Sequence, residues 1–168
     1  MIDLREYGKD ITAVAQAELL KNVKAAVEES GPAHAIEYCN VHATPLSDSI
    51  SDHFDVKVQR ISLKYRNPLN APQSTEDKIL LNHYLESLNE GRAIRDTLFT
   101  MGQQDYYYRP ILIGMETCLK CHGEPGVDID SATQSVLYQL YPEDRAYNYR
   151  MGEFRGAWKV SFAKREEN

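Results

Sequence analysis

Apolar residues recur at helical spacing over the first third of the chain. Their period over residues 11–28 predicts an amphipathic helix. The Ser30–Pro32 stretch breaks this period and predicts the start of a second helix, because proline fits the first helical turn. Thr44–Pro45 combines a capping residue with a proline and predicts a short third helix over Leu46–Ser51.

Alternating apolar residues replace the helical period further along the chain. Residues 56–65 predict a strand, and a change of phase at Gln59–Arg60 indicates a bulge within it. Leu98–Thr100 and Tyr106–Met115 predict a hairpin, and Gly156–Ala163 predicts a closing strand.

Two further helices are expected between these strands. Ser74 is a capping residue for a helix that runs to about Asn89 and stops at Gly91, and Ser131–Leu140 predicts a short helix. Long helices followed by strands of a small sheet indicate the α+β class.

The composition fits one globular domain over residues 1–168, with 42% hydrophobic and 26% charged residues. Nineteen Lys and Arg against 25 Asp and Glu give a formal charge of −6, which argues against nucleic-acid binding. Apolar runs are too short to span a membrane, so membrane contact is expected only through an anchor outside this chain.

Cysteine spacing gives the strongest chemical signal. Cys118, Cys121 and His122 form a C-x-x-C-H motif, the attachment pattern of c-type haem. The two thiols add to the haem vinyl groups, and the adjacent histidine becomes an iron ligand. Two intervening residues place the thiols about one helical turn apart. The motif therefore predicts one covalent haem c with iron bound by His122.

Two other chemistries remain open for these residues. A lone C-x-x-C also occurs in redox dithiols and zinc half-sites. Cys39, Cys118, Cys121 and His122 supply the donors of a Cys₃His zinc site, but adjacent Cys121 and His122 are awkward ligands for one tetrahedral ion. A zinc-stabilised interaction domain without haem is the corresponding alternative.

Covalent haem attachment also predicts the compartment, because the attachment machinery works outside the cytoplasm. The chain begins without the charged and apolar regions of a signal peptide. We therefore expect a periplasmic or other extracytoplasmic protein whose signal peptide or anchor lies outside this sequence.

The motifs together resemble the Tll0287-like (DUF3365) family of periplasmic haem c domains. The Arg-Asn-Pro-x-Asn-x-Pro loop at Arg66–Pro72 is the most specific of them. The matching stretches are Ala35–Cys39, Arg60–Pro72, Cys118–Gly123, Tyr141–Ala146 and Gly152–Ala157. The resemblance implies a PAS-like fold, in which helices flank an antiparallel sheet and haem occupies the ligand pocket.

The second axial ligand of the iron is predicted to be Cys39. This cysteine is spare after haem attachment, and it shares the apolar face of its helix with Ile36 and Ala43. The family resemblance also marks this position as the distal ligand. His42, one turn further on, is the alternative ligand. The other interpretation is that Cys39 is an ordinary buried cysteine that binds no iron.

Basic and aromatic residues of the motifs are candidates to contact the haem itself. Arginine pairs carboxylates with two hydrogen bonds, so Arg60, Lys64, Arg66 and Arg155 are candidates to hold the haem propionates. Tyr107, in the Tyr106–Tyr108 run, is a candidate to line the haem. The alternative for the basic residues is that they are ordinary exposed positions of a strand. The alternative for the tyrosines is that they form aromatic pairs across neighbouring strands.

Two haem functions follow from this reasoning. A labile cysteine ligand fits a sensor of redox state or of a small gas such as CO or NO, and PAS-like analogy favours it. A permanent six-coordinate iron fits a low-potential periplasmic electron carrier with a redox partner protein. No catalytic residues are assigned, and we expect no enzyme activity. A haem peroxidase is the alternative, but it needs an open coordination site and a distal acid–base group, and neither is assigned.

Overall fold

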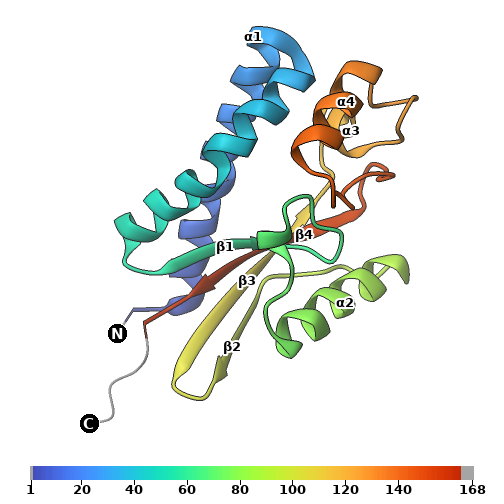
Figure 1. Ribbon diagram of the computed structural model, residues 1–168. Helices are drawn as coiled ribbons and strands as arrows, with labels where there is room; N and C mark the ends of the chain where they lie inside the picture. Colours follow the sequence, from blue (N-terminus) through green and yellow to red (C-terminus); the bar gives the residue numbers. More distant parts are fainter. Residues whose placement is uncertain (1, 164–168) are drawn as a thin grey trace.

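The computed structural model describes residues 2–163, and its elements confirm the expected α+β class (Figure 1). Four α-helices, one short 3₁₀ helix and four strands lie within this range. In chain order they are α1 (Leu4–Phe54), β1 (Lys57–Ile61), η1 (Pro68–Asn70), α2 (Thr75–Asn89), β2 (Thr97–Met101), β3 (Gln104–Leu112), α3 (Glu116–His122), α4 (Ser131–Leu140) and β4 (Phe154–Ser161).

The four strands form an antiparallel sheet in the order β1-β4-β3-β2. Helix α1 covers one face, where Val58, Tyr107 and Val160 pack against Ile11 and Ile50. Helix α2 covers the other face, on which a second cluster gathers around Leu81 and Tyr84. The second cluster also includes four residues of the strands, Ile61, Tyr108, Phe154 and Ala157. Both faces of the sheet are therefore buried.

Helix α1 is bent into two arms that lie back along each other (Figure 1). Asp3 caps its start by accepting hydrogen bonds from the amides of Arg5 and Glu6. Ser30 and Gly31 leave the helical region, and Gly31 has φ +84°, a backbone conformation that favours glycine. The predicted break at this place is confirmed. Despite its length, neither α1 nor another helix within residues 2–163 is apolar enough to cross a membrane.

The separate helix expected over Leu46–Ser51 is wrong, because α1 continues through Pro45 to Phe54. Proline in a helix interior removes one backbone hydrogen bond and normally ends the helix. Here Leu46 and Ile50 pack into the cluster beneath the sheet. Their burial offsets the lost hydrogen bond, so tertiary packing overrides the local signal.

The bulge expected at Gln59–Arg60 is also wrong. Strand β1 pairs with β4 in unbroken register from Lys57 to Ile61. The change of phase in the sequence has another cause, because Val58 faces the α1 side and Ile61 the α2 side of a sheet buried on both faces. A register shift occurs instead in the β3–β4 pair, between Ile111 and Leu112.

A buried charge network lies between α2 and the sheet. The expected Ser74 cap is confirmed, since the Ser74 side chain accepts from the amide of Asp77. Asp77 in turn accepts hydrogen bonds from Lys159 Nζ at 2.9 and 3.1 Å and from the Tyr108 hydroxyl at 2.7 Å. Burial alone would raise the pKa of Asp77, but the Lys159 and Tyr108 hydrogen bonds outweigh it and hold that pKa below its usual value.

We expect Lys159→Met to lower the free energy of unfolding by about 3–5 kcal/mol, because it leaves the Asp77 carboxylate buried without its cation. Denaturant unfolding at pH 7 measures this loss. Lys57→Met, on the exposed side of β1, is the matched control and should change stability by less than about 0.5 kcal/mol. Equal effects of the two substitutions would contradict a stabilising role for the pair.

Candidate functional site

Helix α3 contains all three residues of the C-x-x-C-H motif. Cys118 and Cys121 are half-buried, and their spacing places them about 60° apart around the helix axis, on neighbouring turns. Cys121 packs against the cluster that joins α1 and α4 through Ile36. Cys118 packs against a different cluster around Tyr149. The two thiols therefore occupy one side of a short helix between two apolar clusters.

Polar contacts fix the orientation of the His122 imidazole. Its Nδ1 lies 2.8 Å from the carbonyl oxygen of Ala146. A carbonyl only accepts hydrogen bonds, so Nδ1 is the donor and Nε2 keeps its lone pair for a ligand. Burial lowers the pKa of His122 well below its usual value, and Arg66 and Arg155 lower it further. The imidazole is therefore neutral, which is the form that binds metals.

The segment that supplies this carbonyl is held by Arg66. The Arg66 side chain is buried, and its Nε lies 3.1 Å from Asp144 Oδ2. Its Nη2 donates to the carbonyls of Cys121 and Ala146. The loop that begins at Arg66 thus contacts the backbone of α3. The Arg66 guanidinium, which the sequence suggested as a propionate partner, makes most of its hydrogen bonds within the protein.

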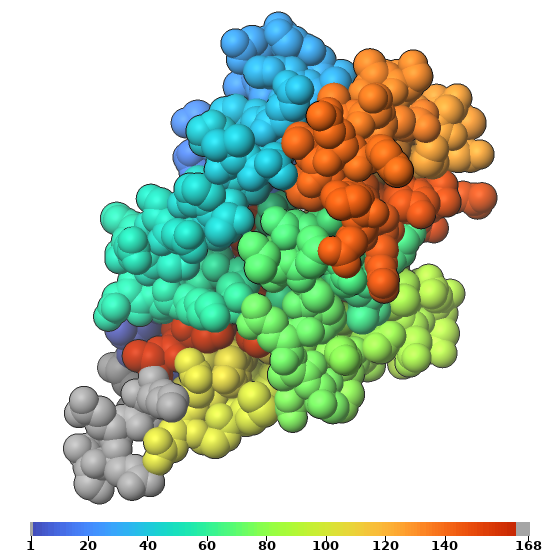
Figure 2. Space-filling view, viewed as in Figure 1, coloured from blue at the N-terminus to red at the C-terminus, as the bar shows by residue number. Residues whose placement is uncertain are grey.

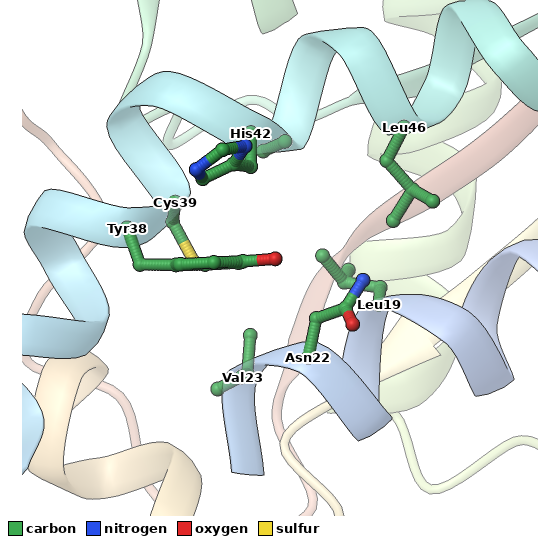
Figure 3. A pocket seen from close by; sticks show the side chains of 8 residues that line it. Leu19, Asn22, Val23, Tyr38, Cys39, His42 and Leu46 are labelled. Carbon is green, nitrogen blue, oxygen red and sulfur yellow. The ribbon is translucent and has the colours of Figure 1, made fainter. Parts of the chain in front are cut away.

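Cys39 lies on the second arm of α1 and lines a small cavity of about 10 Å³ between the two arms (Figure 3). Leu19 and Val23 of the first arm face it, and His42 lines the same cavity. Burial raises the pKa of the Cys39 thiol, while Arg60 and Arg66 oppose this effect.

Electrostatic coupling connects Cys39 with the motif on α3. Burial raises the pKa of Cys121 to about 11, with Arg66 lowering it and Cys39 raising it. Arg60 and Arg66, the two residues that act on Cys39, also lower the pKa of His122. Figure 2 shows the second arm of α1 side by side with α4, and Ile36 of this arm packs with Cys121 of α3.

Two of the predicted basic residues surround Tyr149. Lys64 Nζ lies 4.2 Å from the centre of the Tyr149 ring, and the Arg155 guanidinium lies 5.7 Å from it. His122 meets the same ring edge to face at 6.1 Å. Arg60 stands on β1, with its guanidinium 5.8 Å from the centre of the Trp158 ring. Lys64 and Arg155 thus lie around the ring that contacts His122, whereas the contact of Arg60 is with the core residue Trp158.

Tyr107 is not part of this site, which corrects the expectation from sequence. Its ring is fully buried under the first arm of α1, and its hydroxyl donates to Asp96 at 2.9 Å. A side chain at Gly8 would clash with this ring. Tyr107 therefore lies beside Gly8, whereas the Cys39 cavity lies beside Leu19 of the same arm. Eleven residues separate Gly8 from Leu19, which is about 16 Å along the helix axis. Tyr107 is a core residue between helix and sheet.

Sequence reasoning missed Asp144, Ala146 and Tyr149 as residues of the site. Asp144 and Ala146 stand in the Tyr141–Ala146 motif, but their contact with Arg66 depends on a fold that joins distant loops. Within residues 2–163, the structure groups no three His, Cys, Asp or Glu side chains as a metal site.

Comparisons with known proteins identify the family and the fold. A model of the Tll0287-like family, described as Tll0287, matches residues 5–163. The crystal structure of the cyanobacterial heme-protein Tll0287 superposes with a TM-score of 0.68, over 97% of this chain and 98% of that chain. Its sequence is 24% identical, so this likeness shows a shared fold. No curated protein matches the chain significantly.

We expect the polypeptide to lose stability as the pH falls below 6.5, the usual pKa of histidine. The unfolded chain then binds a proton at His122 that the folded chain excludes, so each pH unit costs about 1 kcal/mol. Denaturant titrations between pH 7 and 5 measure this slope. His122→Gln should flatten it, whereas His83→Gln on the exposed side of α2 should not. An unchanged slope in His122→Gln would contradict the neutral imidazole.

Proposed function

The chain belongs to the Tll0287-like family, and on that premise we propose that it binds one covalent haem c and works as a sensor of redox state or of a small gas. The solved relative is titled a heme-protein, which supports haem as the cofactor of this chain. Attachment of haem to a C-x-x-C-H motif takes place outside the cytoplasm, so we also propose an extracytoplasmic location.

The orientation of His122 is the observation that supports this proposal most directly. Its Nδ1 is bonded to the Ala146 carbonyl at 2.8 Å, which leaves Nε2 as the iron-binding nitrogen. Metal-bound histidines commonly donate their other ring N–H to such a carbonyl. Cys118 and Cys121, one turn apart on the same helix, are the thiols for the two vinyl groups.

Cys39 is the proposed second protein ligand, which would hold the iron together with His122. Its coupling to Cys121, and the arginines that it shares with His122, support a position near the attachment helix. Haem bound at this site supplies an iron that exchanges one electron and that binds CO or NO when a ligand leaves. Cys39 would hold the iron through its sulfur, and an anionic sulfur would favour the ferric form over the ferrous form.

The cationic residues are proposed to bind the propionates. Lys64 and Arg155 lie around the Tyr149 ring that contacts His122, and the charge of Arg60 also lowers the pKa of His122. Arg66 contributes positive charge there, while its hydrogen bonds serve the protein backbone. We further propose that the helices and antiparallel sheet hold the haem as a PAS-like pocket holds its ligand.

Protein matured in a periplasmic haem-attachment system is expected to contain one haem per chain that resists acid–acetone extraction. Absorption spectra of the denatured protein in alkaline pyridine measure the stoichiometry and the number of thioether bonds. Cys118→Ser should reduce the bonds from two to one and lower the yield, because one vinyl then stays free. Met115→Leu, an exposed neighbour of the motif, is the control. A wild-type protein without haem despite active maturation would overturn the proposal.

Replacing Cys39 by Ala should shift the ferric Soret band and raise the reduction potential, because the anionic ligand is lost. Spectroelectrochemistry and EPR of the loaded protein measure both changes. His42→Ala, on the same arm, should leave both unchanged. The opposite pattern would assign the ligand to His42. CO binding to the reduced wild type favours the sensor, and a spectrum that ignores CO favours an electron carrier.

A further inference from the structure

Two loops that are far apart in the sequence join at a buried ion pair. Arg66 Nε lies 3.1 Å from Asp144 Oδ2, and each side chain retains 10% exposure. The residues next to this pair also connect the two loops, because the Arg145 amide donates a hydrogen bond to the Tyr65 carbonyl at 2.9 Å. The Arg145 guanidinium also lies 5.1 Å from the centre of the Tyr65 ring. This double junction fixes the segment after Asp144 against the loop that begins at Arg66.

The segment fixed in this way ends the attachment helix. A helix leaves its last carbonyls without partners, and here other parts of the chain supply them. Arg66 donates to the carbonyl of Cys121, and the amide of Tyr149 donates to the carbonyl of His122 at 2.9 Å. The amide of Asn148 donates to the carbonyl of Gly123 at 2.8 Å. The end of α3 therefore cannot shift without breaking contacts to both loops.

The Ala146 carbonyl is the point where these contacts meet the imidazole. It accepts from His122 Nδ1 at 2.8 Å and from Arg66 Nη2 at 3.1 Å. The amide of the same residue donates to Asp144 Oδ1 at 2.7 Å. Both polar atoms of the Ala146 backbone are thus held by the ion pair, one by each partner.

We propose that Arg66 and Asp144 are a positioning pair, which fixes the His122 imidazole in its Nδ1–H tautomer with Nε2 directed to the ligand. This inference rests on the proposed function for the identity of the ligand. Neither side chain makes a hydrogen bond to the His122 ring. Arg66 acts through the carbonyls of Cys121 and Ala146, and Asp144 acts through the amide of Ala146.

The geometry requires arginine at position 66. A guanidinium presents several donors in a fixed plane, and here one edge serves Asp144 while Nη2 serves two carbonyls. A lysine ammonium is a point charge on a flexible stem and cannot hold these three acceptors in the same geometry. Arg66→Lys therefore keeps the charge and removes the fork, which separates positioning from electrostatics.

The test uses the full chain without haem, labelled with ¹⁵N in its histidine rings. Two-dimensional NMR of the rings reports which nitrogen of His122 is protonated. The wild type should show one Nδ1–H tautomer. Arg66→Lys and Asp144→Asn should show a mixture of the two tautomers, because the Ala146 backbone then loses one of the contacts that hold its carbonyl at Nδ1. Arg109→Lys, a half-buried arginine of β3 outside the site, should match the wild type.

Amide hydrogen exchange on the same samples adds a second readout. Exchange at Asn148 and Tyr149 should accelerate in Arg66→Lys and stay unchanged in Arg109→Lys. If Arg66→Lys lacks cooperative unfolding, the more conservative Asp144→Asn decides the question. A folded Asp144→Asn or Arg66→Lys with the wild-type tautomer would overturn the positioning role.

Loaded protein then separates this inference from the proposed function. A weaker Nδ1 hydrogen bond makes His122 a poorer electron donor to iron, so both variants should have a higher reduction potential than the wild type. Unchanged potentials with an altered tautomer in the haem-free chain would overturn positioning toward haem. If the wild type takes up no haem, the proposed function fails, while the NMR comparison still decides whether the pair orients His122.

Discussion

The ion pair between Arg66 and Asp144 is the contact on which the geometry of the site depends. A buried ion pair is stable only when its remaining donors and acceptors are also satisfied, because both charges lose their hydration. Here Nη2 of Arg66 reaches two backbone carbonyls, and the second oxygen of Asp144 accepts from the Ala146 amide. The desolvation cost is thus offset by hydrogen bonds that fix the backbone around His122.

The bend in α1 explains how the arm that contains Cys39 comes to pack with α3. Gly31 allows the helix to reverse, and both arms then pack on one face of the sheet. Cys39 comes eight residues after the bend, on the arm whose neighbour Ile36 packs with Cys121. The opposite face of the sheet is occupied by α2 and the Asp77–Lys159 pair, and the motif cysteines pack in two other, smaller clusters.

Some elements of the fold could be predicted from interactions between residues close in sequence, and others could not. Ser74, Gly31 and the C-x-x-C-H motif act through neighbours a few residues away, and the cap and the helix break were predicted correctly. The path of α1 through Pro45 depends on burial of Ile50 against the sheet, which no local pattern encodes. Tyr107 was misassigned for a related reason, because alternation along a strand does not distinguish a core face from a site.

Charge balance around His122 gives an independent argument for the kind of ligand that the site accepts. Burial lowers the pKa of Arg155 to about 10 and also lowers the pKa of Arg60, so each guanidinium bears a desolvation cost. Arg66 has Asp144 as its counter-ion, but within residues 2–163 no acidic side chain forms an ion pair with Arg60 or Arg155. Both side chains are half-buried, and Arg155 Nη1 donates to the Ser62 hydroxyl at 2.9 Å and to the Lys64 carbonyl at 3.1 Å. Neither guanidinium therefore has a carboxylate partner within the described residues, which is why the proposed function assigns these two arginines to the propionates of the ligand.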